Sequence, residues 1–457
     1  MSRPRVFRDP IHGLINIHPG DEFLLDLIDA PEFQRLRRVR QLGVSHLTYP
    51  GAEHTRFNHS LGVFHLAQRM LEGLTRLYGH DSSIGRLIIE HSRHVKAAAL
   101  LHDTGHAAFS HLMERAFEGS ADHEERSQSL ISGSNSSIPG ILKKHGLNAI
   151  TVADIVGKRF PHRFLQDIVS SSLDADRMDY LLRDAHFTGV RYGVYDLEWL
   201  INSLCLGTLK PQKDEGEELL RLCLDHKRGL YSAEQLLMAR QHMSMQVYFH
   251  KSTRRWEAHL LCLFREAARL EKEGKLPAGT LPMVKDYFAK EGGVKDDVFL
   301  CVDEPAVIGC LGLWAVSDKK HHELLARLAT TYLNRQKIFH MKELHTGAAA
   351  AAEWRKELEE LPGKWHNCWE LDAISFIAYK MPKVGDKEHD PEGYFQKIAA
   401  NAVLLSRGSA SDAAVPVQDE SPIFRTLGAE QPKFLRLYFL PEMEKTIVKI
   451  DKKLKLN

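Results

Sequence analysis

The sequence of 457 residues predicts a mainly α-helical fold with a small β-hairpin element and a smaller α+β lobe at the C-terminal end. Apolar residues recur at helical spacing through most of the first 330 residues. Two apolar runs flank a charged turn in GTLKPQKDEGEELLRLCL, which is the pattern of two paired strands. Beyond about residue 330 the helical periods weaken, and strand-like runs such as FLRLYFL appear. We therefore expect a helical core with an N-terminal arm over residues 1–330 and the α+β lobe over residues 331–457.

The first elements are short. Residues 1–20 are predicted to form an extended arm and a turn, because Asp9-Pro10, His12-Gly13 and Pro19-Gly20 interrupt regular structure. Pro31 is predicted to begin the next element, PEFQRLRRVRQL.

Longer helices follow. Asn58 can cap an amphipathic helix that runs to Gly79, so His59 falls in its first turn. A second helix, RHVKAAALLH, stops at Gly105 and places His102 and Asp103 at its end. A third spans roughly 164–185 and carries LDADRMDYLLRD, and a long helix or helix pair begins at YSAEQ. Polar stretches at 132–140, 383–392 and 406–421 are predicted to be loops, the last two mobile.

Composition excludes several classes of protein. Lys and Arg (61) nearly balance Asp and Glu (60), so no overall field draws the chain to nucleic acid or to an anionic membrane. Six dispersed cysteines with no CxxC pair argue against a zinc ribbon or a disulfide framework and predict buried thiols in a reducing compartment. The N-terminus resembles no signal peptide, and no run of about 18 apolar residues occurs. We therefore expect a soluble, cytoplasmic protein.

Thirteen of the 26 histidines fall in the first 123 residues, which suggests a metal site. A divalent metal used in hydrolysis suits neutral imidazoles plus carboxylates, and His59, His102, Asp103 and Asp176 supply such a set from three helices. A single histidine is more often a core or surface residue, but here four residues need one explanation. On spacing alone, Asp174 or Asp179 could replace Asp176.

These motifs occur in the order H…HD…D within the blocks RDPIHG, EFQRLRRVRQLG, YPGAEHTRFNHSLG, LLHDTGHAAFSH, DHEE and DADRMDYLLRD. The set resembles the HD-domain phosphohydrolases, and within them the deoxynucleoside triphosphate (dNTP) triphosphohydrolase branch that includes an animal protein with SAM and HD domains. The match runs from about residue 5 to about residue 255, and no segment corresponds to the SAM domain. The resemblance implies an HD-domain catalytic core in which the four ligands bind Mn²⁺, Fe²⁺, Zn²⁺, Co²⁺ or Ni²⁺, with Mg²⁺ accompanying the nucleotide.

The resemblance also implies a reaction, the cleavage of a dNTP into deoxynucleoside and inorganic triphosphate. His111 and Glu114 are three residues apart, so a helical turn would let the carboxylate hold the imidazole protonated for the leaving group. Glu114 stands where the family often has Asp, and His106 could instead be a helix-end residue without a catalytic role. By resemblance, the acid/base group beside the metal comprises His106, His111, Glu114, His123 and Glu124.

Substrate contacts are expected along one helix face, because Asp176, Tyr180 and Asp184 are spaced at i, i+4 and i+8. In the family, the matching tyrosine packs under the deoxyribose and the matching aspartate binds the 3′-hydroxyl. Arginines and lysines on helices are usually solvated, so their assignment to phosphate rests on the resemblance. The predicted substrate residues are Gln41, Leu42, Arg56, Arg177, Tyr180, Asp184, Arg240 and Tyr248, with Lys251 as further phosphate charge.

A nucleotide activator site is the last expectation from the resemblance. Arg5, Asp29, Gln34 and Arg37 match the family's activator pocket, which takes GTP or dGTP between subunits and so implies a homo-oligomer, a dimer or a tetramer. RLRRVR could equally be the basic face of an amphipathic helix. Arg8 departs from the animal protein's Asn, while Arg335 and Lys337 match later effector residues less closely.

Two other functions compete with the dNTP reaction. One is an HD phosphomonoesterase or phosphodiesterase, which the DHEE segment and the Tyr180–Asp184 face disfavour. The other is a protein that only binds nucleotides or single-stranded nucleic acid, for which the basic RLRRVR segment is the argument. Intact metal ligands favour an enzyme.

Overall fold

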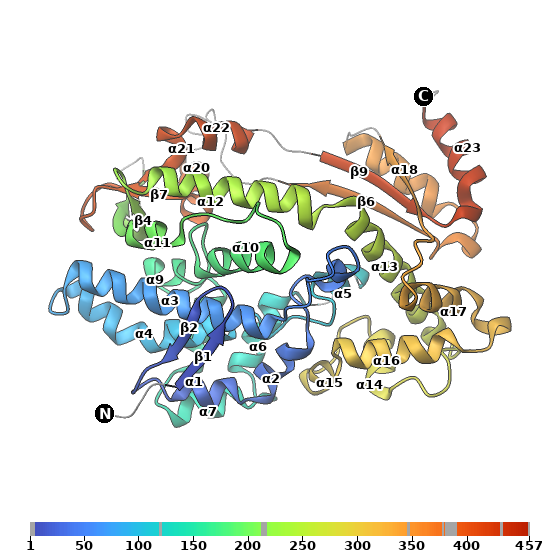
Figure 1. Cartoon of the computed structure of the whole chain (residues 1–457), viewed down its shortest axis with the longest axis horizontal. Coiled ribbons are helices and arrows are strands. Elements are labelled where there is room, and N and C mark those ends of the chain that lie inside the picture. Colours follow the sequence, from blue (N-terminus) through green and yellow to red (C-terminus); the bar gives the residue numbers. More distant parts are fainter. Residues whose placement is uncertain are drawn as a thin grey trace.

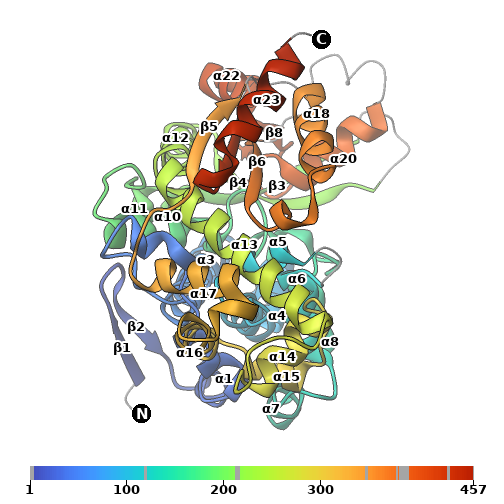
Figure 2. The ribbon, with the colours of Figure 1, turned by 90° about the vertical axis from the view of Figure 1, so that its right-hand side faces the viewer.

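The computed structural model describes residues 5–117, 121–211, 217–344, 348–376, 379, 391–429 and 433–455. Helices dominate, and small sheets lie mostly in the C-terminal part, as predicted (Figure 1). The C-terminal elements gather on one side of the helical core in two perpendicular views (Figures 1 and 2). No helix among the described residues is long and apolar enough to cross a membrane.

The predicted N-terminal arm is a β-hairpin. Strand β1 (Arg5–Asp9) pairs antiparallel with β2 (Gly13–Ile17), and the turn between them lies against the helical core. Ile15 and Ile17 face the core and are buried, whereas most of β1 is exposed.

The basic segment after the hairpin is not one amphipathic helix. It forms α2 (Pro31–Gln34) followed by a 3₁₀ turn, η1 (Arg35–Arg38). Arg35 is buried and donates hydrogen bonds to the carbonyl oxygens of His106 (2.7 Å) and Val302 (2.8 Å). Only part of this basic run therefore faces solvent.

Three helices position the predicted metal ligands. Helix α3 (Arg56–Tyr78) packs against α4 (Ser83–Leu101) and α10 (Ala175–Thr188). Thr55, not Asn58, is the N-cap residue of α3, because its extended backbone (φ −109°, ψ 162°) starts the helix three residues earlier. The predicted helix at 164–185 is two helices, α9 (Arg163–Asp167) and α10, because Asp174 caps a new N-terminus by accepting from Arg177 N.

The remaining helices of the core enclose this group or extend it. The predicted long helix after residue 230 is a pair joined by a π-helical turn. The bounds are α1 (Phe23–Ile28), η2 (Gly43–Leu47), α5 (His111–Ala116), α6 (His123–Ser132), α7 (Ile138–Lys144), α8 (Ala149–Val156), α11 (Leu197–Asn202), α12 (Leu230–Met243), η3 (Ser244–Tyr248), α13 (Lys251–Lys272), α14 (Pro282–Ala289), α15 (Asp296–Cys301), α16 (Glu304–Ala315) and α17 (Lys319–Leu333).

Two sheets build the rest of the chain. The predicted strand pair is present as β3 (Leu204–Leu209) and β4 (Leu219–Asp225), which β7 (Leu404–Ser406) and β8 (Val415–Pro416) extend in the order β3-β4-β7-β8. The second sheet has the order β5-β9-β6, with β5 (His340–Leu344), β6 (Trp369–Ser375) and a central β9 (Lys433–Phe439). The associated helices are α18 (Ala348–Glu359), η4 (Gly363–Trp365), α20 (Pro391–Asn401), α21 (Val417–Glu420), α22 (Pro422–Ala429), η5 (Pro441–Met443) and α23 (Glu444–Lys455).

Several finer predictions differ from the structure. Residues 406–421 are not a single loop, because they contain β8 and α21; residues 383–390 lie outside the described part. Five of the six free cysteines are buried as expected, but Cys301 is exposed. The boundary at residue 330 stays a prediction, and β7 pairs with β4 across it at Leu405 and Leu224.

Candidate metal centre and active site

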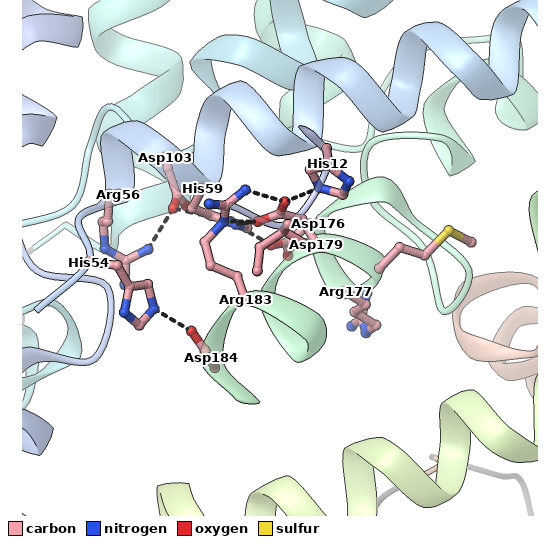
Figure 3. Close-up of polar contacts among 12 residues, drawn as sticks. His12, His54, Arg56, His59, Asp103, Asp176, Arg177, Asp179, Arg183 and Asp184 are labelled. Carbon is pink, nitrogen blue, oxygen red and sulfur yellow. Dashed lines mark hydrogen bonds and ion pairs between the residues drawn. The ribbon is translucent and has the colours of Figure 1, made fainter. Parts of the chain in front are cut away.

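Side chains at the adjoining ends of three helices converge on the predicted metal position. The ligand atoms of His59 (α3), His102 and Asp103 lie within 4.8 Å of one another. From α10, Asp176 Oδ1 lies 3.0 Å from His59 Nε2 and 3.8 Å from His102 Nε2 (Figure 3). The structure thus brings all four predicted ligands together.

Both imidazoles are oriented as metal ligands require. His59 Nδ1 is 2.8 Å from Asp179 Oδ2, and His102 Nδ1 is 2.9 Å from the Ala99 carbonyl oxygen, so each Nδ1 donates and each Nε2 keeps its lone pair. Both Nε2 atoms are buried without a hydrogen-bond partner. Two unpartnered nitrogens beside two carboxylates fit a divalent cation.

The carboxylates around His59 favour positive charge at this position. Burial by itself lowers the pKa of His59. The neighbouring Asp176, Asp179 and Asp103 more than offset this effect and raise the pKa to about 10. The same site would therefore attract a cation that replaces the imidazole proton.

The structure separates the three aspartates that spacing left open. Asp174 accepts from the backbone of Arg177 and Ser171, and so caps α10. Asp179 binds Nδ1 of His59, on the side of the ring away from the metal position. Asp176 is the one whose oxygen lies beside Nε2 of both histidines, so the geometry favours it as the ligand.

Asp103 is held by Arg56, the first residue of α3. Arg56 Nη1 donates to Asp103 Oδ2 over 2.6 Å, and Arg56 Nε donates to Ser110 Oγ over 3.0 Å. Burial raises the pKa of Asp103, but the positive charge of Arg56 and the nearby histidines hold it well below the usual range. This carboxylate is therefore ionised.

The predicted acid/base residues form a second cluster next to the metal position. His106, His111, Glu114 and His123 have ligand atoms within 4.8 Å of one another, and the rings of His106 and His123 stack at 3.9 Å. Gly105 permits this approach, because a Cβ there would lie 2.3 Å from the His123 carbonyl oxygen. Ser127 of α6 ties the same turn by accepting from Gly105 N and donating to the His102 carbonyl.

Protonation differs within this second cluster. Burial and the charge of Arg56 hold the pKa of His106 well below its ordinary value, so His106 is neutral. Burial raises the pKa of Glu114, but hydrogen bonds from His111 and His123 lower it below the usual carboxyl range. An ionised Glu114 thus faces both His111 Nδ1 (3.2 Å) and His123 Nδ1 (3.3 Å). Glu124 lies apart, where it forms an ion pair with Lys158 over 2.8 Å.

A cavity of about 420 Å³ joins the two clusters. Asp184 lies on its wall, where it accepts from Tyr248 Oη (2.8 Å) and is 2.7 Å from His54 Nε2. Gln41 Oε1 is buried without a partner and is available to a ligand. Of the predicted residues, the lining includes Asp103, Asp176, His106, His111, His123, Gln41, Leu42, Arg56, Tyr180, Asp184 and Tyr248.

Some predicted phosphate residues lie outside this lining. Arg177 points away from the metal position and is bound to Asp174 and to the Ser171 carbonyl (Figure 3). Arg177 and Arg240 both line a small separate cavity, together with Leu181 of α10. Sequence reasoning missed Arg115 and Arg254, which line the main cavity and share Glu257 as an ion-pair partner. No motif distinguishes these two arginines from surface ones.

The predicted activator residues lie in the N-terminal segments. Arg37 Nε donates to Gln34 Oε1 (2.9 Å), and the Arg37 guanidinium stacks over Phe57. Arg5 is exposed on β1, and Asp29 is exposed at the end of α1. Arg335 donates to the Leu47 carbonyl, and Lys337 lines another cavity.

Comparison with known proteins relates these clusters to one family. The HD domain family model matches residues 56–184, the segment that contains all four predicted metal ligands. The chain is 34% identical over 395 residues to the uncharacterized protein YwfO of Bacillus subtilis, covering 85% of this chain and 84% of YwfO. It is also 33% identical over 218 residues to the mouse deoxynucleoside triphosphate triphosphohydrolase SAMHD1, which covers 41% of this chain and 32% of SAMHD1.

Solved structures agree with this relationship over nearly the whole chain. A phosphohydrolase from Bacteroides thetaiotaomicron superposes with a TM-score of 0.72 at 27% identity, covering 96% of this chain and all of that one. A hypothetical protein from Aquifex aeolicus gives a TM-score of 0.67 at 26% identity over 98% of this chain and all of its own. With its H…HD…D ligands at adjoining helix ends and a relative that matches almost end to end, the chain belongs to the HD-domain phosphohydrolases.

Proposed function

We propose that the protein is a metal-dependent dNTP triphosphohydrolase, which cleaves a dNTP to deoxynucleoside and inorganic triphosphate. One observation carries the proposal: a single cavity is lined by metal-ligand carboxylates, by the acid/base histidines and by the Tyr180–Asp184 face. The similarity to SAMHD1 supports the same substrate class.

The metal centre would act on the α-phosphate. His59, His102, Asp103 and Asp176 would hold a divalent ion, which when bound would supply Lewis-acid chemistry to neutralise phosphoryl charge and to activate water. Arg56 lines the cavity beside Asp103 and adds positive charge where the phosphate would lie.

The second cluster would handle protons. Departure of the 5′ oxygen needs an acid, and the ionised Glu114 faces Nδ1 of both His111 and His123, the two candidate proton donors. His106 is a poor proton donor because it is held neutral, so we assign it to orienting the substrate or the stacked His123. Glu124 has no direct part, because it is paired with Lys158 outside the cavity lining.

The sugar would lie along α10. Tyr180 lines the cavity between Asp176 and Asp184 and would leave little space for a 2′-hydroxyl. Asp184 is fixed by His54 and Tyr248, and its carboxylate would accept the 3′-hydroxyl. We retain Gln41 and Leu42 as sugar contacts, and Arg177, Arg240 and Lys251 as sources of positive potential around the triphosphate.

Regulation and assembly are further parts of the proposal. We propose that GTP or dGTP binds at Arg5, Asp29, Gln34 and Arg37 in a cytoplasmic homo-oligomer. The exposure of Arg5, Asp29 and Arg37 supports a site that a second subunit completes.

The test is direct. Purified protein with Mn²⁺ or Mg²⁺ is incubated with each dNTP and each NTP, with and without GTP or dGTP, and the products are separated by chromatography. We expect deoxynucleoside and inorganic triphosphate from dNTPs only. Nucleoside monophosphate plus pyrophosphate would instead identify an HD phosphodiesterase-type reaction, and binding without turnover would identify a nucleotide-binding protein.

A further inference from the structure

We infer that the turn of the β1–β2 hairpin is part of the metal centre: Asp9 and His12 are positioning residues that hold Asp179, and through it His59, in the metal-binding orientation. The inference rests on metal binding by the HD site and not on the identity of the substrate. It assigns a role to His12, which the sequence left without one.

The contacts form a continuous chain from the hairpin to the ligand. His12 Nε2 lies 2.7 Å from Asp179 Oδ1, while the other oxygen, Oδ2, accepts from His59 Nδ1 over 2.8 Å. Arg183 donates to both oxygens of Asp179, over 2.8 and 2.9 Å. It also donates to both oxygens of Asp9, over 2.8 and 3.2 Å. Asp9 and His12 therefore act on His59 through a single carboxylate.

Burial makes this network of contacts energetically significant. The side chains of Asp179 and Arg183 are 0% exposed, and those of Asp9 and His12 are 5% and 2% exposed. Removing one member of a buried charge network leaves the others uncompensated, which is far more costly than losing a surface ion pair. Without Asp9, Arg183 would lose the two hydrogen bonds that fix it from the hairpin side and would keep only those to Asp179, so Asp179 would be held less firmly.

The surrounding backbone is built to fit this network. A Cβ on Gly62 of α3 would lie 1.8 Å from Asp179 Oδ1 and 2.6 Å from Arg183 Nη2, so glycine is required for the helices to enclose the pair. Asp9 also accepts from the backbone of Ile11 (2.9 Å) and His12 (3.0 Å), which fixes the turn that presents His12.

A two-stranded hairpin is marginally stable by itself, and most of β1 is exposed. Ile15 and Ile17 of β2 are buried in the core, and at the turn end the side chains of Asp9 and His12 are buried as well. The groups that orient His59 thus help to hold the turn of the hairpin against the core, which joins its docking to the geometry of the metal site.

The experiment compares three His12 and His18 variants. His12→Leu removes the donor to Asp179, His12→Gln keeps a side-chain N–H at a similar reach, and His18→Leu is the matched control because His18 is exposed at the end of the same hairpin. Metal-free full-length protein is titrated with Mn²⁺ by calorimetry and with Co²⁺ by visible absorption, and the Tm of the metal-free protein is measured.

We expect His12→Leu to weaken Mn²⁺ binding about tenfold or more, the range seen for partners of metal-bound histidines. We expect a changed Co²⁺ spectrum for His12→Leu, near-normal affinity for His12→Gln and no effect of His18→Leu. Unchanged affinity in a folded His12→Leu variant with a lowered Tm would overturn the inference, since the network would then only hold the hairpin.

Asp9→Asn provides an independent test, and its affinity for Mn²⁺ should also fall about tenfold. If this variant does not fold, the His12 pair decides alone, because His12→Leu leaves both Asp9–Arg183 bonds in place. Nucleotides are absent from the titrations, so failure of the protein to hydrolyse dNTPs would refute the proposed function and leave this inference standing.

Discussion

The metal half and the acid/base half of the site differ in how firmly their side chains are held. In the metal half, the side chain of His59 is 1% exposed, and its Nδ1 atom is fixed by a buried network of Asp179, Arg183, Asp9 and His12. In the acid/base half, the side chain of His111 is 61% exposed and its partner Glu114 is on a helix of only six residues.

This difference indicates a fixed centre beside an adjustable one. Helix α5 begins directly after Phe109 and Ser110, whose φ angles of 58° and 55° are strained for residues with side chains. Buried imidazoles whose Nδ1 atoms are already hydrogen-bonded can bind a metal through Nε2 without reorganisation, whereas acid/base residues need small adjustments when substrate enters. We expect substitutions in the metal half to abolish metal binding. We expect substitutions in the acid/base half to lower turnover while the metal stays bound.

The largest effect is expected for the metal half. Changing His102 or Asp103 to Ala removes a ligand, so bound metal should be lost and dNTP hydrolysis should fall about a thousandfold or more, equivalent to about 4 kcal/mol of transition-state stabilisation. Metal content by elemental analysis and the turnover rate check this. Full metal content in either variant would show that these residues are not ligands.

His111→Ala should give a smaller loss with a different signature. The variant should retain metal and a similar KM, while kcat falls about a hundredfold or more, the usual contribution of a general acid. Loss of metal in parallel with kcat would mean that the two halves are not independent, and would contradict the comparison. His94→Ala is a suitable control, because it makes the same chemical change outside the cavity lining.

How far the sequence predicts the site follows the same division. A His-Asp doublet can bind one ion only from a helix end, and local sequence patterns mark helix ends. His59, His102 and Asp103 are therefore recognisable from the sequence. The partners that orient them are not recognisable, because His12 reaches Asp179, and Asp9 reaches Arg183, only after the chain folds back over more than 160 residues. Asp176 and Asp179 are three positions apart on one helix, so the sequence left Asp179 as an alternative to Asp176. Only the packing against α3 shows that Asp179 faces Nδ1 of His59 and that Asp176 faces its Nε2.

The fold was predictable in kind but not in its boundaries. Helical periodicity predicts α3 closely, but the predicted helix RHVKAAALLH covers only the C-terminal part of α4 (Ser83–Leu101). The break between α9 and α10 depends on the capping bonds of Asp174, which a periodicity of apolar residues does not reveal. Arg35 is another such case. Its basic segment suggested a solvated face, but tertiary contacts with two distant carbonyl groups bury it.

Glu114→Gln sharpens the assignment of the acid. The substitution keeps the size of the side chain but removes the carboxylate that faces Nδ1 of both His111 (3.2 Å) and His123 (3.3 Å). A general acid that loses its orienting carboxylate transfers its proton less efficiently, so kcat should fall about tenfold or more while the metal content stays unchanged. An unchanged kcat would show that neither His111 nor His123 is the proton donor.

Glu124→Gln should have the smallest effect, although Glu124 belongs to the same DHEE segment as His123. Its carboxylate pairs with Lys158 over 2.8 Å at the surface, with side chains 44% and 47% exposed, so the interaction contributes at most about 1 kcal/mol to stability. Glu124 does not line the cavity, whereas His123, the preceding residue of α6, does. We therefore expect kcat and KM within twofold of the wild-type values under steady-state conditions. A loss of tenfold or more would mean that α6 moves when substrate binds and brings Glu124 into the acid/base half, which would make that half adjustable over a whole helix.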